Sequence, residues 1–496
     1  METERRLIKI HKSDNVAVAV TALLKGERIR VGETEVLLGE DIRPGHKASL
    51  VHISANEKII KYGYPIGKAS CDIPAGMHVH THNVHTLLSE SFEYSYDGAE
   101  AKQYRPPEIQ APDIQAYKRA DGKIGIRNEV WIIPTVGCVN KTAEALALWG
   151  STVYADGVHA WTHPYGCSQM GDDHETTRLM LADLALHPNA ASVLIVALGC
   201  ENNSVDEFKK LLGAYDTDRI RFLVTQKAED EIAEGRLMLS ELFAYSSRFK
   251  RERVSASRLV VGMKCGGSDG FSGITANPLV GLFCDRITAM GGTAILTEVP
   301  EMFGAERILM ERCETPAVFD KTVSLINGFK DYFTAHNQTV YENPSPGNKE
   351  GGITTLEDKS LGCVQKGGKA PVRDVLKYGE RSNRTGLVLL EGPGNDIVST
   401  TALTASGAHL ILFTTGRGTP LGAPVPTLKI ASNSALADHK KNWIDFDAGR
   451  LLAEDGGDLL EELFALVLDT ASGSYCAKNE TNGYREIAIL KNGVTL

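Results

Sequence analysis

The sequence predicts an α/β protein in which a small N-terminal β module precedes two doubly wound, largely parallel α/β regions. Residues 1–93 contain short alternating stretches separated by glycine-containing turns, a pattern typical of strands. From residue 117 onward, apolar strands alternate with helical patterns, and the alternation resumes after residue 251. Such alternation favours parallel sheets. The predicted divisions are a β module at 1–93, a proline-rich linker at 94–116, and α/β regions at 117–250 and 251–496.

The composition indicates a cytoplasmic enzyme. Of the 496 residues, 42% are hydrophobic and 23% are charged, as in globular proteins. The net charge of -10 argues against nucleic acid as a partner. No apolar run is long enough to span a bilayer, and residues 1–15 lack the apolar core of a signal peptide. Nine scattered cysteines are unlike a secreted disulfide framework.

One stretch combines a strand, a polar glycine loop and a helix start. Residues 259–264 form a short apolar run, and the glycine-rich loop at 265–270 contains a thiol, a hydroxyl and a carboxylate. Asn277 is a favourable N-cap and Pro278 suits the first helical position, so a helix is expected to run from there to the glycines at 291–292. A helix start after such a loop offers backbone N–H groups to an anion. The alternative is an ordinary strand–helix connection.

Histidines are concentrated in the N-terminal module. His78, His80 and His82 alternate with other residues, so an extended chain would direct all three to one side. His11 follows the first predicted strand, and His46 lies in a turn. Two imidazoles on one face suit a divalent metal. The alternative is an edge strand whose histidines bond to backbone groups.

Four cysteines lie at the ends of predicted strands. Cys138, Cys167 and Cys200 belong to the first α/β region, and Cys265 belongs to the second. They are interpreted as unrelated buried thiols, as a set that includes a nucleophile, or as ligands of iron or an iron–sulfur cluster. Their spacing does not decide between these interpretations.

Other familiar motifs are missing. The sequence has no dinucleotide-binding fingerprint, no Walker A loop and no G-x-S-x-G nucleophile elbow. This argues against nicotinamide, ATP and serine-hydrolase chemistry. A polar segment at 343–359 reads as a long loop without secondary structure, and such loops are commonly functional.

Several long motifs, taken together, resemble the altronate/galactarate dehydratase family. They are the loops at 265–270, 272–278, 343–349 and 414–420. The N-terminal part, with residues 14–17 and 45–47, is similar to that family's SAF (β-clip) domain, and the segment at 78–83 is most similar to the altronate branch. The likeness covers essentially the whole chain.

The resemblance implies a hydro-lyase activated by Fe2+ or Mn2+ that converts D-altronate to 2-dehydro-3-deoxy-D-gluconate in hexuronate breakdown. Removing the C2 proton beside a carboxylate places a second negative charge on the carboxyl group, which a chelated metal would stabilise. A base and an acid are also required. The alternatives are a galactarate or other aldonate or aldarate dehydratase, and a non-catalytic protein that binds metal or sugar acid.

Site roles are expectations at this stage. The metal is expected on His11, His78 and His80 at the junction between the β module and the sheet; the alternative ligands are Cys138, Cys167, Cys200 and Cys265, with an iron–sulfur cluster as the second cofactor option. The expected catalytic groups are His46, Glu298 and Lys349, and the expected substrate-binding residues are Ser268, Asp269, Asn277, Asn348, Thr415 and Arg417. A homodimer is the expected assembly.

Overall fold

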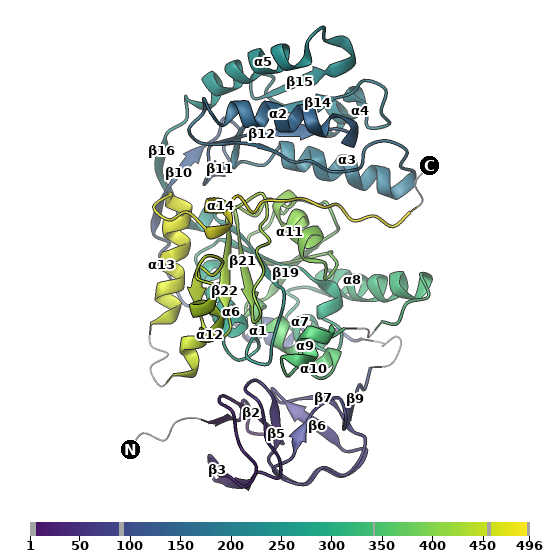
Figure 1. Cartoon of the computed structure of the whole chain (residues 1–496), viewed down its shortest axis with the longest axis vertical. Coiled ribbons are helices and arrows are strands. Elements are labelled where there is room, and N and C mark those ends of the chain that lie inside the picture. Colours follow the sequence, from purple (N-terminus) through teal and green to yellow (C-terminus); the bar gives the residue numbers. More distant parts are fainter. Residues whose placement is uncertain (1–5, 89–93, 341–342, 454–457, 494–496) are drawn as a thin grey trace.

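The computed structural model describes residues 6–88, 94–340, 343–453 and 458–493. Figure 1 shows three stacked parts, with the N-terminal β module at the bottom, the larger α/β region in the middle and the smaller one at the top. The smaller region has a four-stranded parallel sheet and the larger a seven-stranded parallel sheet. The predicted fold class is therefore confirmed.

The β module forms three small antiparallel sheets, ordered β1-β2-β5-β8, β3-β4 and β6-β7-β9. Buried residues alternate with more exposed ones in β3 and β6, whereas every residue of β2 and β5 is buried. Val18, Ala48 and Ile53 are fully enclosed. The strands are β1 Leu7–Ile8, β2 Val16–Ala19, β3 Arg28–Val31, β4 Thr34–Leu37, β5 Lys47–Ser49, β6 Lys58–Lys61, β7 Tyr64–Ala69, β8 His78–Val79 and β9 Val84–His85.

The predicted linker contains regular structure. Helix α1 covers Ala99–Gln103, and strand β10 covers Asp113–Lys118. β10 lies between β11, Ile124–Gly125, and β16, Arg251–Ser255, in a three-stranded antiparallel sheet. The strand that enters the first α/β region therefore pairs with the strand that leaves it. The domain boundaries themselves stay a prediction.

In the first α/β region, the strand order is β13-β12-β14-β15 and all neighbours are parallel. Every residue of β12 and β14 is buried, as expected for apolar runs between helical layers. The elements are β12 Glu129–Pro134, η1 Gly137–Val139, α2 Asn140–Gly150, β13 Val158–Ala160, α3 Gly171–Ala185, β14 Ala190–Ala197, α4 Val205–Leu212, β15 Ile220–Val224, η2 Thr225–Lys227 and α5 Glu231–Ser246.

In the second α/β region, the strand order is β19-β20-β18-β17-β21-β22-β23. The elements to the end of β19 are η3 Ala256–Arg258, β17 Val260–Cys265, α6 Ala276–Ala289, β18 Thr293–Leu296, η4 Val299–Glu301, α7 Glu306–Met310, α8 Pro316–Ala335, α9 Pro346–Glu350, α10 Leu356–Cys363, η5 Val364–Gly367 and β19 Val372–Leu376. The remaining elements are β20 Gly386–Leu390, α11 Asp396–Ala405, β21 Leu410–Thr415, β22 Thr427–Ala431, α12 Ser434–His439, β23 Phe446–Asp447, η6 Gly449–Leu452, α13 Leu459–Ser472 and α14 Lys478–Thr481.

Two local expectations were wrong. Helix α6 begins at Ala276 with Thr275 as its N-cap, so Asn277 lies inside the helix and not at the predicted cap. The Asn277 side chain is instead buried, where it donates to the Gly362 carbonyl and accepts from Thr414 Oγ1 at 2.6 Å. The segment at 343–359, expected to be a loop, contains α9 and the start of α10. Ser345 and Thr355 cap these two helices, and serine and threonine are the residue types that favour a helix start at such positions.

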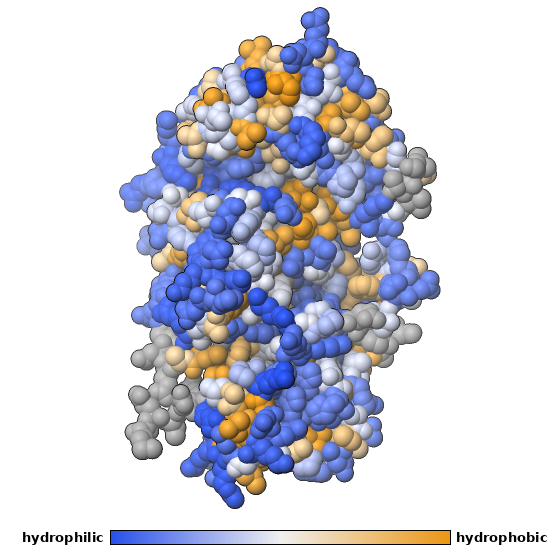
Figure 2. Space-filling view, viewed as in Figure 1, coloured by the Kyte–Doolittle hydropathy of each residue, from blue (hydrophilic) through white to orange (hydrophobic). Residues whose placement is uncertain are grey.

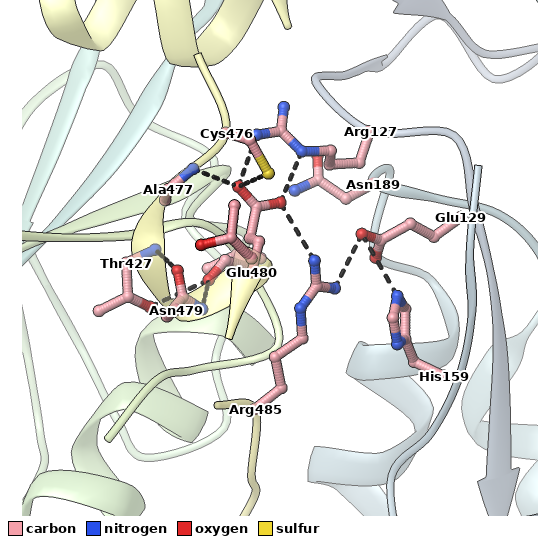
Figure 3. A network of polar contacts seen from close by, with 12 residues as sticks. Arg127, Glu129, His159, Asn189, Thr427, Cys476, Ala477, Asn479, Glu480 and Arg485 are labelled. Atoms are coloured by element: carbon pink, nitrogen blue, oxygen red, sulfur yellow. Dashed lines mark hydrogen bonds and ion pairs between the residues drawn. The ribbon is translucent and has the colours of Figure 1, made fainter. Parts of the chain in front are cut away.

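The C-terminal segment joins the two α/β regions through buried charges (Figure 3). The Arg127 guanidinium binds both oxygens of Glu480 at 2.7 and 2.8 Å. Arg485 donates to Glu129 at 2.8 Å and to Glu480 at 3.1 Å. Paired arginine–carboxylate forks give directional contacts, so this network fixes how the two regions pack.

The outer surface is mixed in character. On the face in Figure 2, hydrophilic residues dominate and apolar residues form separate patches. Within the described residues, the helices are all too short or too polar to cross a lipid bilayer.

Candidate active site

The carboxyl ends of the central strands in the seven-stranded sheet meet the β module. The loop after β17 passes close to the turn before β5, where a Cβ on Gly270 would lie 1.9 Å from the Gly45 carbonyl oxygen. Gly270 also donates from its backbone to the Gly351 carbonyl at 2.8 Å. Glycine is required at this crossing because the backbones touch. In parallel α/β sheets this edge is where ligands bind.

Three histidine rings converge at this junction. The ring centroids of His46, His78 and His80 lie 5.0–5.2 Å from one another, and that of His82 lies 5.6 Å from His78. His78 belongs to β8 and His46 precedes β5, so antiparallel pairing of these strands brings the two rings together. His46 Nδ1 and His78 Nε2 are 2.9 Å apart.

Helix α9 covers the histidines from the side of the sheet. His46 Nε2 donates to the Glu350 carbonyl at 3.1 Å, and His80 Nε2 donates to the Lys349 carbonyl at 2.8 Å. If His46 carries its proton on Nε2, its Nδ1 must accept from the Nε2–H of His78. The network therefore leaves the Nδ1 lone pair of His78 directed away from these bonds.

The environment keeps these imidazoles neutral. Burial lowers the pKa of His46 below its ordinary value. Burial and then the neighbouring imidazoles lower the pKa of His78 to about 3. Burial is also the main reason that the pKa of His80 falls to about 4. Neutral imidazole is the form that binds a metal.

Arg417 lies at the mouth of the same junction, in the loop after β21. Its guanidinium donates to the Gly347 carbonyl at 2.9 Å and to Glu350 at 2.8 Å, and its side chain is 45% exposed. Asn348, also in α9, is buried and donates to the Ser268 carbonyl at 2.8 Å. The predicted residues Ser268, Asn348 and Arg417 are thus brought to one loop cluster.

Other predicted binding residues are occupied within the protein. Asp269 is buried and accepts from Ser272 in its own loop and from Ser432 and Asn433 in the loop after β22, and so it joins these two loops. Thr415 is buried and its hydroxyl accepts from the Gly418 backbone at 2.8 Å. Lys349 is half-buried in α9, and its backbone carbonyl accepts from His80.

A second polar cluster lies buried beneath this edge. The Sγ atoms of Cys265 and Cys363 are 3.4 Å apart, and Glu301 Oε2 lies 3.2 and 3.0 Å from them. Cys265, Glu301 and Cys363 have ligand atoms that all lie within 4.8 Å of one another. They form the only such group of at least three histidine, cysteine or acidic residues in the described part of the chain. Cys363 and Glu301 were not predicted, since neither stands beside a recognisable motif.

Lysines surround this buried cluster. Lys366 Nζ is 2.9 Å from Cys265 Sγ, and Lys359 Nζ is 2.8 Å from Glu301. Lys264 Nζ pairs with Glu298 at 2.5 Å and with Asp396 at 3.0 Å. Burial raises the pKa of Glu301, but Lys359 and the other lysines outweigh it and bring this pKa to about 2. Three ammonium groups make the cluster a poor host for an added cation.

A lysine–aspartate–lysine triad connects the β module to α10. Lys47 and Lys61 each place Nζ 2.9 Å from Asp358, and all three side chains are enclosed. Burial raises the pKa of Asp358, but the two ammonium groups outweigh it and hold this pKa below its ordinary value. Lys47 and Lys61 lie at buried positions of the strands β5 and β6. A lysine at a buried strand position needs a partner, and this was the sequence signal for the triad.

Two predicted ligand sets do not assemble as expected. His11 is exposed and its Nδ1 bonds Ser13 at 2.7 Å, whereas the ring contacts at the junction join His46, His78, His80 and His82. The expected set of four cysteines is divided between two environments. Cys265 is buried with Cys363, whereas Cys138, Cys167 and Cys200 are exposed on the first α/β region. Sequence spacing could not show this division, because Cys265 ends a strand of the seven-stranded sheet and the other three cysteines follow strands of the four-stranded sheet.

Comparison with known proteins identifies the family. Three consecutive family matches cover the chain: "Altronate/galactarate dehydratase SAF domain" over 5–87, "D-galactarate dehydratase/Altronate hydrolase, second domain" over 116–247, and "D-galactarate/Altronate dehydratase, C-terminal" over 256–495. The chain belongs to the altronate/galactarate dehydratase family. The SAF prediction for the N-terminal module is confirmed with it.

Relatives that match nearly the whole chain include altronate and galactarate dehydratases. Altronate dehydratase from Escherichia coli (strain K12) is 51% identical, with 99% of each chain covered. Altronate dehydratase from Bacillus subtilis (strain 168) is 49% identical over 99% of this chain and 100% of its own. Galactarate dehydratase (L-threo-forming) from Escherichia coli (strain K12) is 33% identical over 94% of this chain and 92% of its own.

Proposed function

We propose that this protein is a sugar-acid dehydratase, a hydro-lyase that eliminates water from D-altronate to give 2-dehydro-3-deoxy-D-gluconate. The observation that carries the proposal is identity of about half to two altronate dehydratases over the full chain, against 33% to the galactarate enzyme. The junction supplies groups that suit the reaction: neutral imidazoles, and helix α9, which carries Lys349 and accepts hydrogen bonds from His80 and Arg417.

In this proposal His78 and His80 hold a divalent cation, Fe2+ or Mn2+. Metal-bound histidines commonly donate their second ring N–H to a backbone carbonyl, which fixes the ring. His80 does so to Lys349, and His78 is held by His46. The neutral form of all three rings fits the same role. When bound, such a cation would supply Lewis-acid stabilisation of the charge that develops on the substrate carboxylate.

The remaining roles belong to residues of the chain itself. Arg417 is proposed to bind the substrate carboxylate, because its planar fork matches two oxygens. Lys349 is proposed to take the C2 proton, since it belongs to α9 and its backbone carbonyl accepts a hydrogen bond from His80 at the junction. His46 has both ring nitrogens engaged, so we assign it as a positioning residue and not as the expected acid.

Glu298 is likewise a positioning residue in this proposal. Its side chain is 1% exposed and accepts from the Cys265 backbone at 2.9 Å. Together with Lys366 it leaves no open approach for a sugar hydroxyl, so the acid role expected from the sequence is not retained. The identity of the metal, a cytoplasmic location and a homodimer stay predictions.

A substrate panel tests the function. Purified protein is incubated with Fe2+ or Mn2+ under reducing conditions with D-altronate, D-galactarate and further aldonates, and 2-keto acid formation is followed. We expect the highest kcat/KM with D-altronate and loss of turnover after chelation. A preference for galactarate would reassign the substrate. Binding of altronate without product would show a non-catalytic binding protein.

A further inference from the structure

Three loops of the first α/β region share one motif. Gly137-Cys138, Gly166-Cys167 and Gly199-Cys200 follow β12, β13 and β14 respectively, and each precedes a helix of the same region. The three strands are direct neighbours in the order β13-β12-β14 and run parallel. Their carboxyl ends therefore bring the three thiol-bearing loops to one edge of the sheet.

Backbone contacts interlock these loops. Gly137 donates to the Tyr165 carbonyl at 2.9 Å, and Asn203 donates from its backbone to the Gly166 carbonyl at 3.1 Å. Ser168 donates from its backbone to Asn202 Oδ1 at 2.9 Å. The first and third loops are also joined, since Thr135 donates to Glu201 at 2.6 Å. The loop between them thus contacts both of its neighbours.

The glycines permit this close approach. A Cβ at Gly166, whose φ is +99°, would lie 2.0 Å from the Thr135 carbonyl oxygen. A Cβ at Gly137 would lie 3.0 Å from the His163 carbonyl oxygen. Ser168, directly after Cys167, has a φ of +58°, which is uncommon for a residue with a side chain. The backbones of these loops therefore pack closely against one another directly beside the cysteines.

All three thiols are exposed and uncommitted to the core. Their sulfur contacts are weak: Gln226 lies 3.4 Å from Cys200 Sγ and Ser168 Oγ lies 3.9 Å from Cys167 Sγ. The helices that follow, α2, α3 and α4, begin at this same edge. The partial positive charge at three helix starts would offset the negative charge of a thiolate-bound centre.

Soft thiolate ligands select iron and iron–sulfur centres over hard cations. A single ion needs its ligand atoms close together, and no group of three within 4.8 Å includes these cysteines in the described residues. A multinuclear cluster separates its thiolates more widely and prefers soft sulfur ligands. We propose that Cys138, Cys167 and Cys200 hold a [4Fe–4S] cluster. Three protein thiolates leave one iron open to an oxygen ligand such as water or a hydroxy acid.

This site is distinct from the histidine junction. It lies on the four-stranded sheet, whereas the junction lies where the seven-stranded sheet meets the β module (Figure 1). The cluster proposal consequently does not rest on the function proposed above. It also differs from the four-cysteine set expected from the sequence, because Cys265 is excluded.

Anaerobic reconstitution with Fe2+ and sulfide tests the proposal. We expect about four iron and four sulfide per chain and a visible absorption band that bleaches on reduction. The single changes Cys138→Ser, Cys167→Ser and Cys200→Ser should each reduce the band severalfold, and the triple variant should lose it. Exposed Cys71 and Cys476 provide the matched control, so Cys71→Ser/Cys476→Ser should keep the full band.

The outcomes separate the two proposals. A colourless reconstituted protein, a band that survives in the triple variant, or equal loss in the control variant would each overturn the cluster. Thermal unfolding of the unreconstituted variants checks that the substitutions leave the fold intact. Turnover of D-altronate with Fe2+ or Mn2+ is measured separately. A cluster without altronate turnover supports this site and contradicts the proposed function, and turnover in a colourless protein does the reverse.

Discussion

The two parallel sheets of this protein differ in how far other parts of the chain cover the carboxyl ends of their strands. On the four-stranded sheet, three Gly-Cys loops present exposed thiols to the surroundings. On the seven-stranded sheet, the same kind of edge is covered by the β module and α10, and its charged groups are buried in pairs. An edge that another part of the chain covers must neutralise its charges internally, because an unpaired buried charge is strongly unfavourable.

The sharpest test of this comparison removes the histidines that the covered edge holds. The double change His78→Ala/His80→Ala should lower altronate turnover by more than about 1,000-fold, since Lewis-acid stabilisation is worth several kcal/mol. Steady-state kinetics with added Fe2+ or Mn2+ measures the effect. His11→Ala is the control and should retain activity, because the exposed His11 ring bonds Ser13 and not the junction histidines. Unchanged metal activation in the double variant would refute the assignment.

Breaking the lysine–aspartate–lysine triad between the β module and α10 should destabilise the protein. Asp358→Asn leaves Lys47 and Lys61 enclosed without a carboxylate, so the free energy of unfolding should fall by about 3–5 kcal/mol. Denaturant titration measures this loss. The matched control is Glu462→Gln, which breaks the half-exposed Arg450 pair and should change stability by less than about 1 kcal/mol. Equal effects would show that burial of the triad contributes little.

The same triad predicts a pH dependence. Because the pKa of Asp358 is lower in the folded protein than in the unfolded chain, its contribution is complete above the ordinary carboxyl pKa and is lost as pH falls below it. The stability gap between the wild-type protein and Asp358→Asn should therefore narrow as pH is lowered from about 5 to about 2. Denaturation curves across this range measure the gap. A constant gap would argue against an ionised Asp358.

The smallest expected effect concerns Arg417, which is half-exposed at the mouth of the histidine junction. Arg417→Lys keeps the charge but loses the fork, so KM for altronate should rise about 10-fold while kcat changes little. Initial-rate kinetics measures both constants. Arg450→Lys is the control because its side chain is similarly exposed at 50%. A fall in kcat at unchanged KM would place Arg417 in the chemical step and not in binding.

Much of the fold could be predicted because apolar strands followed by glycine loops are local signals. The run at 259–264 indeed forms β17, shifted by one residue, and the helix expected to end at 291–292 is α6. Helix starts were less predictable. Asn277 resembles a cap, but its amide is used to join α6 to Thr414, a partner 137 residues away in the sequence.

The site was predictable only in part, for a physical reason. Alternation in an extended segment identified His78 and His80, because side-chain direction along a strand is a local property. Their partner His46 depends on pairing of β5 with β8, and Cys363 meets Cys265 across 98 residues of sequence. Contacts of this range are set by topology, which residue spacing does not encode.

Helix α10 has neighbouring residues that serve different parts of the molecule. Glu357 accepts from Thr86 and Leu87 at the end of the module, Asp358 binds the module's lysines, and Lys359 reaches Glu301 at the sheet. One turn of helix α10 thus connects the β module with the seven-stranded sheet, although these parts are far apart along the chain. Displacing the module would remove the two lysine ammonium groups that neutralise Asp358. We therefore expect the module and α10 to stay together or separate as a single unit.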